Sequence, residues 1–227
     1  MNPLRVIIGY DKREPVSFDK AERSLRKHAS VPVHVTRMDI VRLAEQGMLR
    51  RPTDRRGVIY DIPSNAPAST DFAISRFLCP MLLHEGWGLF VDSDVVFTAD
   101  VAELFALADP AYAVMVVKHG PQGVAAFKMD GQVQVPYPRK NWSSVVLWNA
   151  DHPANKRLSM ADVQERRGFD LHQFYWLADS EIGSLPDEWN WLVGCQPKPE
   201  HPKIAHFTLG TPETSERVEH ADLWNDA

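Results

Sequence analysis

The sequence predicts an α/β fold, a mostly parallel mixed sheet flanked by helices, on the strength of two observations. From residue 4 to residue 119, short apolar runs typical of buried strands alternate with amphipathic segments typical of helices. This alternation is characteristic of parallel strands joined by crossover helices. The chain has 227 residues, of which 44% are hydrophobic, and this is enough for one sizeable core. We therefore expect a single domain.

The first elements follow one another closely along the chain. LRVIIGY (4–10) has the composition of a buried strand, and PVSFDKAERSLRKHA (15–29) has the apolar spacing of an amphipathic helix. A second strand at 31–40 and a short helix at 41–49 follow. Residues 50–69 are polar and contain three prolines, which predicts a long loop and a candidate lid.

The next elements surround an apolar strand that carries two acids. FAISRFLCPMLLHEG (72–86) is predicted to be one helix, capped by Thr70 or Asp71 and kinked at Pro80. Three further elements complete the regular half of the chain (1–119): the strand GLFVDSDVVF (88–97), a helix near 100–108 and a strand at 112–119.

The second half, residues 120–227, is less regular. Residues 120–142 are rich in Gly, Gln, Pro and Lys, and no credible linker separates the halves. The elements expected here are a strand SSVVLWN (143–149), two modest helices, an aromatic run LPDEWNWLVG (185–194) and a strand KIAHFTLG (203–210).

Composition excludes several classes of protein. A net charge of −5 gives no support to broad nucleic-acid binding, and Cys79 and Cys195 match no zinc or redox spacing. The N-terminus lacks a signal peptide and no apolar run approaches a membrane span of about 20 residues, so a soluble, cytoplasmic protein is expected. The alternative of a local basic track for nucleic acid is left open; it would be formed by Arg51, Arg55, Arg56, Arg139 and Lys140.

The strand 88–97 carries Asp92 and Asp94 within an apolar run. Burying two neighbouring carboxylates is very costly unless a cation accompanies them. Residues i and i+2 of a strand point to the same face, roughly 7 Å apart along the backbone. Hard divalent cations such as Mg²⁺ or Mn²⁺ bind one or two carboxylates together with substrate phosphates. The alternative is that Asp-Ser-Asp is a turn between two short strands, because both residue types favour turns.

The acidic segment WGLFVDSDVVFTADVAELF resembles the D-x-D region of nucleotide-sugar glycosyltransferases with the GT-A fold. It is most similar to the family-eight group, which contains glycogenin and bacterial lipopolysaccharide galactosyltransferases. Four more segments are similar to small bacterial and phage glycosyltransferases: STDFAISRFLCP, GQVQVPYPRKNWSSVVLWN, DEWNWLVG and HFTLGTP. The resemblance covers nearly the whole chain in order, and it implies a nucleotide-binding half (1–119), an acceptor half (120–227) and a bacterial or phage-infected bacterial cell.

The resemblance assigns roles to residues of the first half. Gly9, Tyr10 and Asp11 would hold the nucleotide, with Tyr10 stacked on uracil and Asp11 accepting from the base; an ordinary strand end with a turn aspartate is the alternative. Arg76 would reach the acidic pair and the donor, where a guanidinium makes bidentate contacts, unless it forms only a surface ion pair. Ser93, between the two acids, would also face the donor.

The resemblance also makes His206 the third metal ligand, although a lone histidine in a strand is often structural. An imidazole beside two carboxylates suits Mn²⁺ better than Mg²⁺. The family follows this histidine with Gly, Lys, Pro and Trp. Here Gly210 and Pro212 are present, the lysine is missing and Glu213 replaces the tryptophan. The backbone N–H groups near Gly210 are then the remaining candidates for holding phosphate.

The second half supplies the other expected contacts. Arg139 and Lys140 are candidate phosphate cations, although Lys140 also fits a plain basic turn. Ser143 and Ser144 are candidate partners of sugar hydroxyls. Either Asp179 or Glu181 is the expected acid near the anomeric carbon, with Asp179 favoured. A structural motif behind the acceptor cleft is expected at Trp189, Asn190 and Trp191.

Together with the family resemblance, these residues predict a metal-dependent glycosyltransferase that moves a hexose from a UDP-sugar to an acceptor hydroxyl. The resemblance implies retention of configuration. The acceptor stays open between a glycan, a lipid-linked sugar, a protein and modified DNA. One alternative is a nucleotidyltransferase, which normally shows a Gly-rich phosphate loop where this chain has GYDKREP. The other is a binding module of the same fold without activity.

Overall fold

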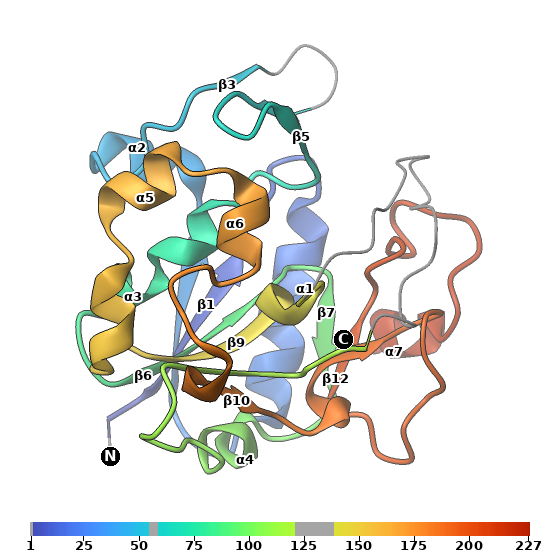
Figure 1. Ribbon diagram of the computed structural model, residues 1–227. Coiled ribbons are helices and arrows are strands. Elements are labelled where there is room, and N and C mark those ends of the chain that lie inside the picture. The colour runs from blue at the N-terminus through green and yellow to red at the C-terminus, as the bar shows by residue number, and fades with distance from the viewer. Residues whose placement is uncertain (1, 55–58, 121–138) are drawn as a thin grey trace.

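A six-stranded sheet forms the centre of the structure, a computed structural model that describes residues 2–54, 59–120 and 139–227 (Figure 1). The strand order is β10-β8-β9-β6-β1-β2, and β9 is antiparallel to both of its neighbours whereas the other neighbouring pairs are parallel. The strands are β1 (Leu4–Gly9), β2 (Val33–Met38), β6 (Trp87–Val91), β8 (Val114–Val116), β9 (Val145–Asn149) and β10 (Ile182–Ser184). The expected mixed, mostly parallel sheet is confirmed.

The two halves of the chain share this sheet, because β9 of the second half lies between β6 and β8 of the first. Two small sheets accompany it: β11 (Trp191–Leu192), β12 (Ile204–His206) and β7 (Val95–Phe97), and β3 (Thr53–Asp54), β4 (Ile59–Asp61) and β5 (Ala66–Ala68). The helices are α1 (Pro15–His28), α2 (Ile40–Glu45), α3 (Cys79–Leu83), α4 (Val101–Phe105), α5 (Met160–Glu165), α6 (Gly168–His172) and α7 (Ala221–Asn225). Short 3₁₀ turns are η1 (Ser75–Leu78), η2 (Trp142–Ser144), η3 (Pro153–Arg157), η4 (Asp179–Glu181) and η5 (Asp187–Asn190).

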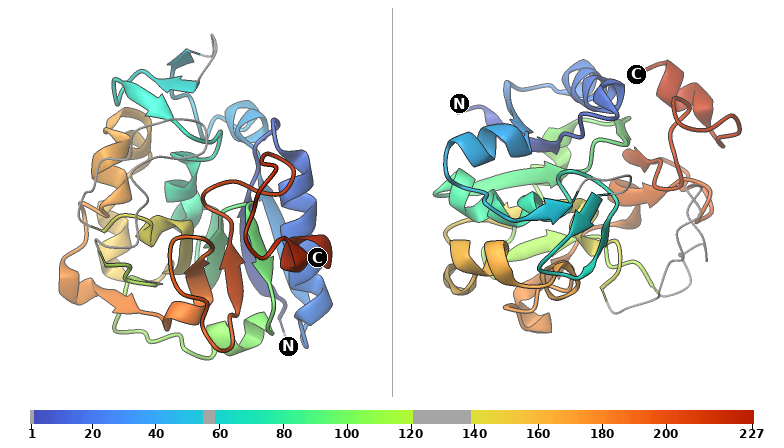
Figure 2. Two further views of the ribbon diagram at one scale, coloured as in Figure 1. Left: turned by 90° about the vertical axis from the view of Figure 1, so that its right-hand side faces the viewer. Right: turned by 90° about the horizontal axis from the view of Figure 1, so that it is seen from above.

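Alternate side chains of each central strand enter two different hydrophobic clusters. In β1, Val6 and Ile8 pack in the cluster that contains α1, whereas Ile7 packs in the cluster that contains α3, α5 and α6. Figure 2 shows the blue helix α1 and the orange helices α5 and α6 on opposite faces of the sheet. The sheet is therefore covered on both faces. Each fully buried side chain of this kind stabilises the fold by roughly 1.5–3 kcal/mol.

The single helix predicted at 72–86 is wrong. Residues 71–74 form a turn, η1 follows, and an α-helix exists only at Cys79–Leu83. Pro80 lies in the first turn of α3, the place where a residue without an N–H is tolerated, so it starts a helix here and does not kink one. The N-cap positions of η1 and α3 are Ile74 and Leu78, and not Thr70 or Asp71.

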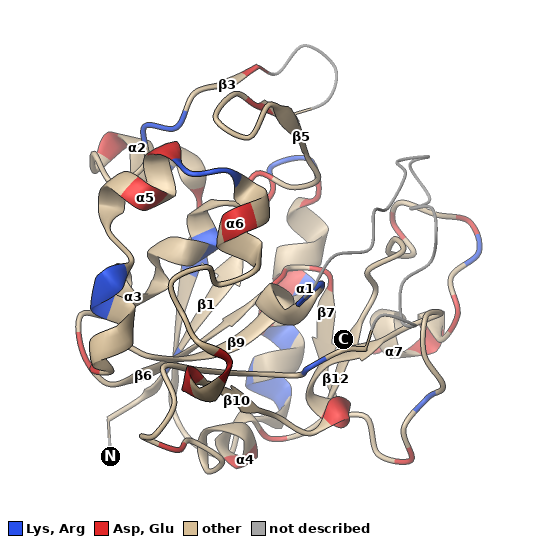
Figure 3. Ribbon diagram, in the orientation of Figure 1, with Lys and Arg blue, Asp and Glu red and all other residues tan. Residues whose placement is uncertain are grey.

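The segment predicted as a long loop, 50–69, contains the small antiparallel sheet β3–β4–β5 in the residues described. Its anchor is a buried ion pair in which Arg51 Nε lies 2.5 Å from Asp61 Oδ1. Arg51 also donates to the Val163 carbonyl at 2.9 Å. Arg51 is therefore buried and removed from the proposed basic track, while Arg55 and Arg56 lie outside the described residues. Figure 3 shows basic and acidic residues interspersed along the described chain.

The end of β1 is held closely against the segment that follows β5. A Cβ atom built on Gly9 would lie 2.5 Å from the ring of Phe72, which is itself buried. Only glycine allows this approach of strand to ring.

We expect Gly9→Ala to destabilise the fold by about 1–3 kcal/mol, because the methyl group must displace the Phe72 ring. Chemical denaturation of the two proteins measures this difference. Adding Phe72→Leu to the alanine variant should recover part of the loss. A Gly9→Ala protein as stable as the parent would contradict this packing.

Candidate metal and nucleotide-sugar site

The acidic pair lies at a bend where the chain passes from the central sheet to a smaller one. β6 ends at Val91, and β7 begins at Val95 and pairs antiparallel with β12. The prediction of one continuous strand is therefore wrong, and the alternative of a turn between two short strands describes the backbone. The bend places Asp92 and Asp94 outside the apolar interior of the sheet, which explains how two acids follow so apolar a run.

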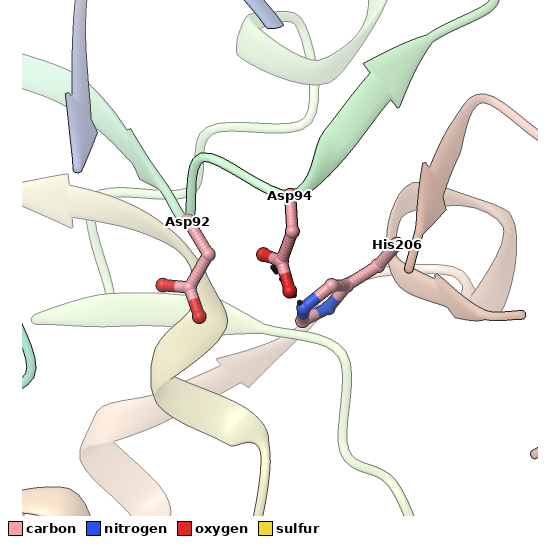
Figure 4. A group of neighbouring side chains, drawn as sticks. All are labelled: Asp92, Asp94 and His206. Carbon is pink, nitrogen blue, oxygen red and sulfur yellow. Dashed lines mark ion pairs between the residues drawn. The ribbon is translucent and has the colours of Figure 1, made fainter. Parts of the chain in front are cut away.

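The pairing of β7 with β12 brings His206 opposite Val95 and beside the two acids (Figure 4). One potential ligand atom from each of Asp92, Asp94 and His206 lies within 4.8 Å of the others. The structure thus brings together the three residues that the sequence analysis assigned to a metal. Asp92 and Asp94 are partly buried, whereas His206 is almost fully buried.

Arg76 supports the acid that is farther from His206. Its Nη1 atom lies 2.7 Å from Asp92 Oδ1 and donates to the Ser143 carbonyl at 3.0 Å. Its Nε atom donates to the Ala73 carbonyl at 3.1 Å. Because Arg76 is only 5% exposed, this is a buried charge with a defined position and the predicted contact with the acidic pair is present.

His206 is fixed at both ring nitrogens. Nε2 lies 3.2 Å from Asp94 Oδ1, and Nδ1 lies 2.9 Å from Asn190 Oδ1. Burial lowers the pKa of His206, but the charge of Asp94 and its hydrogen bond outweigh burial and raise the pKa above its ordinary value. Asp94 therefore favours the protonated, positively charged form of His206 while no ion is bound.

A second buried histidine lies behind the first. His119 Nε2 lies 3.0 Å from Asn190 Nδ2, and its Nδ1 lies 3.1 Å from Gln196 Nε2. Burial, and secondly the nearby charge of His206, lower the pKa of His119 to about 4. His119 is consequently neutral at physiological pH.

A cavity of about 230 Å³ opens beside Asp94. Among the described residues that line it there are three carboxylates, from Asp11, Glu14 and Asp94, and neither a lysine nor an arginine. An anion with the charge of a diphosphate would be repelled there unless a cation entered with it. The cavity is lined by Asp11, Glu14, Ser69, Thr70, Phe72, Ser93, Asp94, Phe207, Thr208, Leu209, Gly210, Thr211 and Thr214.

The donor set fits a divalent cation. Two carboxylates and one imidazole converge from three positions, and the lining next to them lacks basic side chains among the residues described. Oxygen ligands suit Mg²⁺ and Mn²⁺, and the added nitrogen favours Mn²⁺.

The residues at the end of β1 are placed differently from one another. Asp11 lines the cavity, but its carboxylate accepts from the backbone N–H and side chain of Arg13 and from the Asp71 N–H. Burial raises the pKa of Asp11, yet these hydrogen bonds lower it further, so the carboxylate stays ionised. Tyr10 packs edge-on against Phe18, and Arg37 covers its ring at 4.5 Å. Gly9 faces Phe72.

The loop after His206 differs from the expectation for phosphate binding. The N–H of Gly210 already donates to the Phe207 carbonyl at 2.9 Å, so this particular group closes a turn. Glu213, which stands where the resemblance expects a tryptophan, accepts from Trp224 Nε1 at 3.4 Å. Gly210 and Ser93 do line the cavity.

Two of the remaining predicted residues, Arg139 and Asp179, line a second cavity of about 590 Å³. Asp179 is exposed there and lies 2.5 Å from Arg139 Nη2, whose guanidinium also donates to the carbonyl of Gln173 at 2.5 Å. Glu181 is turned elsewhere: it pairs with Arg157 and accepts from the Ala178 N–H at 2.8 Å. Neither acid belongs to the group formed by Asp92, Asp94 and His206.

The two serines belong to the described lining of neither cavity, and Lys140 is half-buried. Ser143 Oγ lies 2.7 Å from His172 Nδ1, and Ser144 Oγ donates to the Asn141 carbonyl at 2.8 Å. Both are buried, and Asp92 donates its N–H to the Ser144 carbonyl at 2.9 Å.

Sequence reasoning missed His119 and treated Asn190 only as part of a structural motif. His119 follows β8, a strand parallel to β6 in direction, so the carboxyl-end rule for α/β sheets was a usable signal. The role of Asn190 had no comparable signal, because its contacts join segments 71 and 16 positions away along the chain.

One curated relative decides the family. Protein CDI of Arabidopsis thaliana is 42% identical over 230 residues, covering 98% of this chain and 85% of that protein. The chain belongs to the family of Protein CDI. No family model matches the sequence. The narrower resemblance to family-eight and phage enzymes stays a prediction.

Several solved glycosyltransferases have the same fold. WbbM, a bifunctional enzyme, superposes with a TM-score of 0.67 at 17% identity, and GlyE of Streptococcus pneumoniae with 0.60 at 17%. The galactosyltransferase LgtC gives 0.54 at 10% and covers 98% of this chain. The chain spans only about half of WbbM (49%) and 60% of GlyE. These similarities establish a GT-A type fold for this member of the Protein CDI family.

Across the described residues, none of the helices is both long and apolar enough to cross a membrane.

We expect the free energy of unfolding to fall by about 3 kcal/mol between pH 6.5 and pH 4 because of His119. The sign follows from the lowered pKa: over this range the unfolded chain takes up a proton at His119 and the folded chain does not. His119→Gln should remove this part of the pH dependence in urea unfolding, whereas the control His201→Gln, at an exposed position, should keep it. Equal pH dependence in both variants would contradict the assignment.

Proposed function

We propose that the protein is a metal-dependent glycosyltransferase that transfers a hexose from a UDP-sugar to an acceptor hydroxyl. The observation that carries the proposal is the convergence of Asp92, Asp94 and His206, of which Asp94 lines a cavity without basic side chains among its described lining residues. A nucleotide diphosphate can enter such a cavity only with a cation, and the fold is that of glycosyltransferases.

In this proposal Asp92, Asp94 and His206 hold Mn²⁺ or Mg²⁺. When bound, the ion neutralises the diphosphate and stabilises the departing nucleotide as a Lewis acid. Asp94 and His206 already face one another at 3.2 Å, so little rearrangement is required of them. Arg76 holds Asp92 in place, and in this proposal the Asp92 carboxylate lies between Arg76 and the donor.

The nucleotide and sugar contacts follow from the walls of the two cavities. Asp11, Ser93 and the turn at Gly210 border the smaller one, where the nucleotide diphosphate would lie. Tyr10 can stack on a base only with its face that Arg37 does not cover. Ser143 and Ser144, whose carbonyls accept from Arg76 and from the Asp92 N–H, are assigned to the sugar hydroxyls.

The larger cavity is assigned to the acceptor, with Asp179 as the acid nearest the reacting carbon. Trp142, Tyr175 and Gln173 line this cavity, a mixture of aromatic faces and polar groups that suits a sugar. Asp179 would have to exchange its contact with Arg139 for one with substrate. Glu181 is the weaker candidate because Arg157 and the Ala178 N–H already occupy it. Retention of configuration is carried over from the family resemblance.

The test is a thermal-shift screen of nucleotide sugars with and without Mn²⁺, followed by Asp94→Ala. The true donor at 100 times its Kd should raise the midpoint of the parent by roughly 5–10 °C in the presence of Mn²⁺. Asp94→Ala should abolish this shift while its own midpoint without ligand stays near that of the parent. Asp19→Ala, at an exposed position of α1, is the control and should respond like the parent.

Three outcomes separate the hypotheses. Slow Mn²⁺-dependent hydrolysis of a UDP-sugar to UDP supports a transferase, whereas binding of UDP without any turnover indicates a binding module. Activity on a nucleoside triphosphate and a sugar phosphate indicates a nucleotidyltransferase. If Asp94→Ala binds UDP with the same Mn²⁺ dependence as the parent, the site assignment is wrong.

A further inference from the structure

The side chain of Asn190 joins the candidate metal ligand His206 to a buried polar network. Asn190 is fully buried, with 0% exposure. Its oxygen faces His206 Nδ1 at 2.9 Å, and its nitrogen faces Ser144 Oγ and His119 Nε2, both at 3.0 Å. Both N–H groups and the oxygen of this amide are therefore directed at side chains in or next to the site.

The orientation of the Asn190 amide follows from Ser144. The hydroxyl of Ser144 donates its proton to the Asn141 carbonyl at 2.8 Å, so toward Asn190 it can only accept. The group that faces Ser144 must then be the amide nitrogen, which leaves the amide oxygen facing His206.

An oxygen at this place decides the tautomer of His206. A carbonyl oxygen cannot donate, so Nδ1 of His206 must carry the proton and donate it to Asn190. In a neutral ring the other nitrogen, Nε2, is then free of a proton. Nε2 is the nitrogen that lies beside Asp94 Oδ1, on the side of the acidic pair.

We propose that Asn190 is a positioning residue of the metal site, which holds His206 as the Nδ1–H tautomer and aims the Nε2 lone pair at the ion. The inference rests on the proposed function only for the presence of that ion. Mutation of a hydrogen-bond partner behind a metal-bound histidine typically lowers metal affinity about 10–100-fold. Without Asn190, Asp94 would favour the opposite tautomer, in which Nε2 carries the proton and cannot bind a cation.

Two variants of similar size separate this role from a purely structural one. Asn190→Asp keeps an oxygen acceptor toward His206 Nδ1, whereas Asn190→Leu removes it. Both variants lose the amide nitrogen and its bonds to Ser144 and His119, so both should lower the unfolding midpoint. Only Asn190→Leu should weaken Mn²⁺ binding, by 10–100-fold in a titration followed by electron paramagnetic resonance of the free ion. Asn190→Asp should bind Mn²⁺ within about threefold of the parent or more tightly.

A second measurement needs neither metal nor activity. Nitrogen-15 spectra of histidine-labelled, metal-free parent protein at pH 9 should show that Nδ1 of His206 carries a proton, and in Asn190→Leu that proton should move to Nε2. The proposal is overturned if the parent carries the proton on Nε2, or if folded Asn190→Leu binds Mn²⁺ as tightly as Asn190→Asp. Should Asn190→Leu fail to fold, the spectrum of the parent decides. A parent that binds no Mn²⁺ yet shows the Nδ1–H tautomer refutes the proposed function and the metal-positioning role with it, and leaves only the control of the His206 tautomer by Asn190.

Discussion

Two carboxylates held close together in a partly buried bend require positive charge, and most of the site is arranged around that requirement. Asp92 has the guanidinium of Arg76 at 2.7 Å, and Asp94 has the imidazole of His206 at 3.2 Å. Neither partner lies in the cavity that opens beside Asp94. Each carboxylate thus has one partner outside the cavity, and Asp94 also lines the cavity, whose described lining residues include no lysine or arginine.

The fold creates this arrangement by moving the chain from one sheet to another. β6 belongs to the central parallel strands, and β7 leaves to pair with β12, so the bend between them falls at the carboxyl end of a buried strand. In α/β sheets this edge is where ligands bind. Because the same pairing fixes His206, the histidine and the acids are positioned by backbone hydrogen bonds and not by loop conformation alone.

The regular elements and the acidic pair were predictable from the sequence, since they depend on local patterns. β1, α1 and β9 follow from apolar spacing, and Asp92 and Asp94 are conspicuous because they interrupt an apolar run. His206 and Arg76 were assigned only by family resemblance. The helix expected at 72–86 failed because periodicity does not reveal that Pro80 starts a helix, and the loop at 50–69 failed because the Arg51–Asp61 pair is invisible in composition. Asn190 acquires its role from contacts between distant segments, which no local pattern encodes, whereas the position of His119 after β8 was a signal that sequence reasoning did not use.

The central claim is that Asp92, Asp94 and His206 bind one divalent ion together with a nucleotide diphosphate. Anomalous diffraction from crystals grown with Mn²⁺ and UDP tests it most directly. The account predicts a single manganese peak within about 2.0–2.4 Å of a carboxylate oxygen of each aspartate and of His206 Nε2, with the diphosphate completing the coordination. A well-ordered UDP without manganese at these three side chains, or manganese bound at another place in the protein, would contradict it.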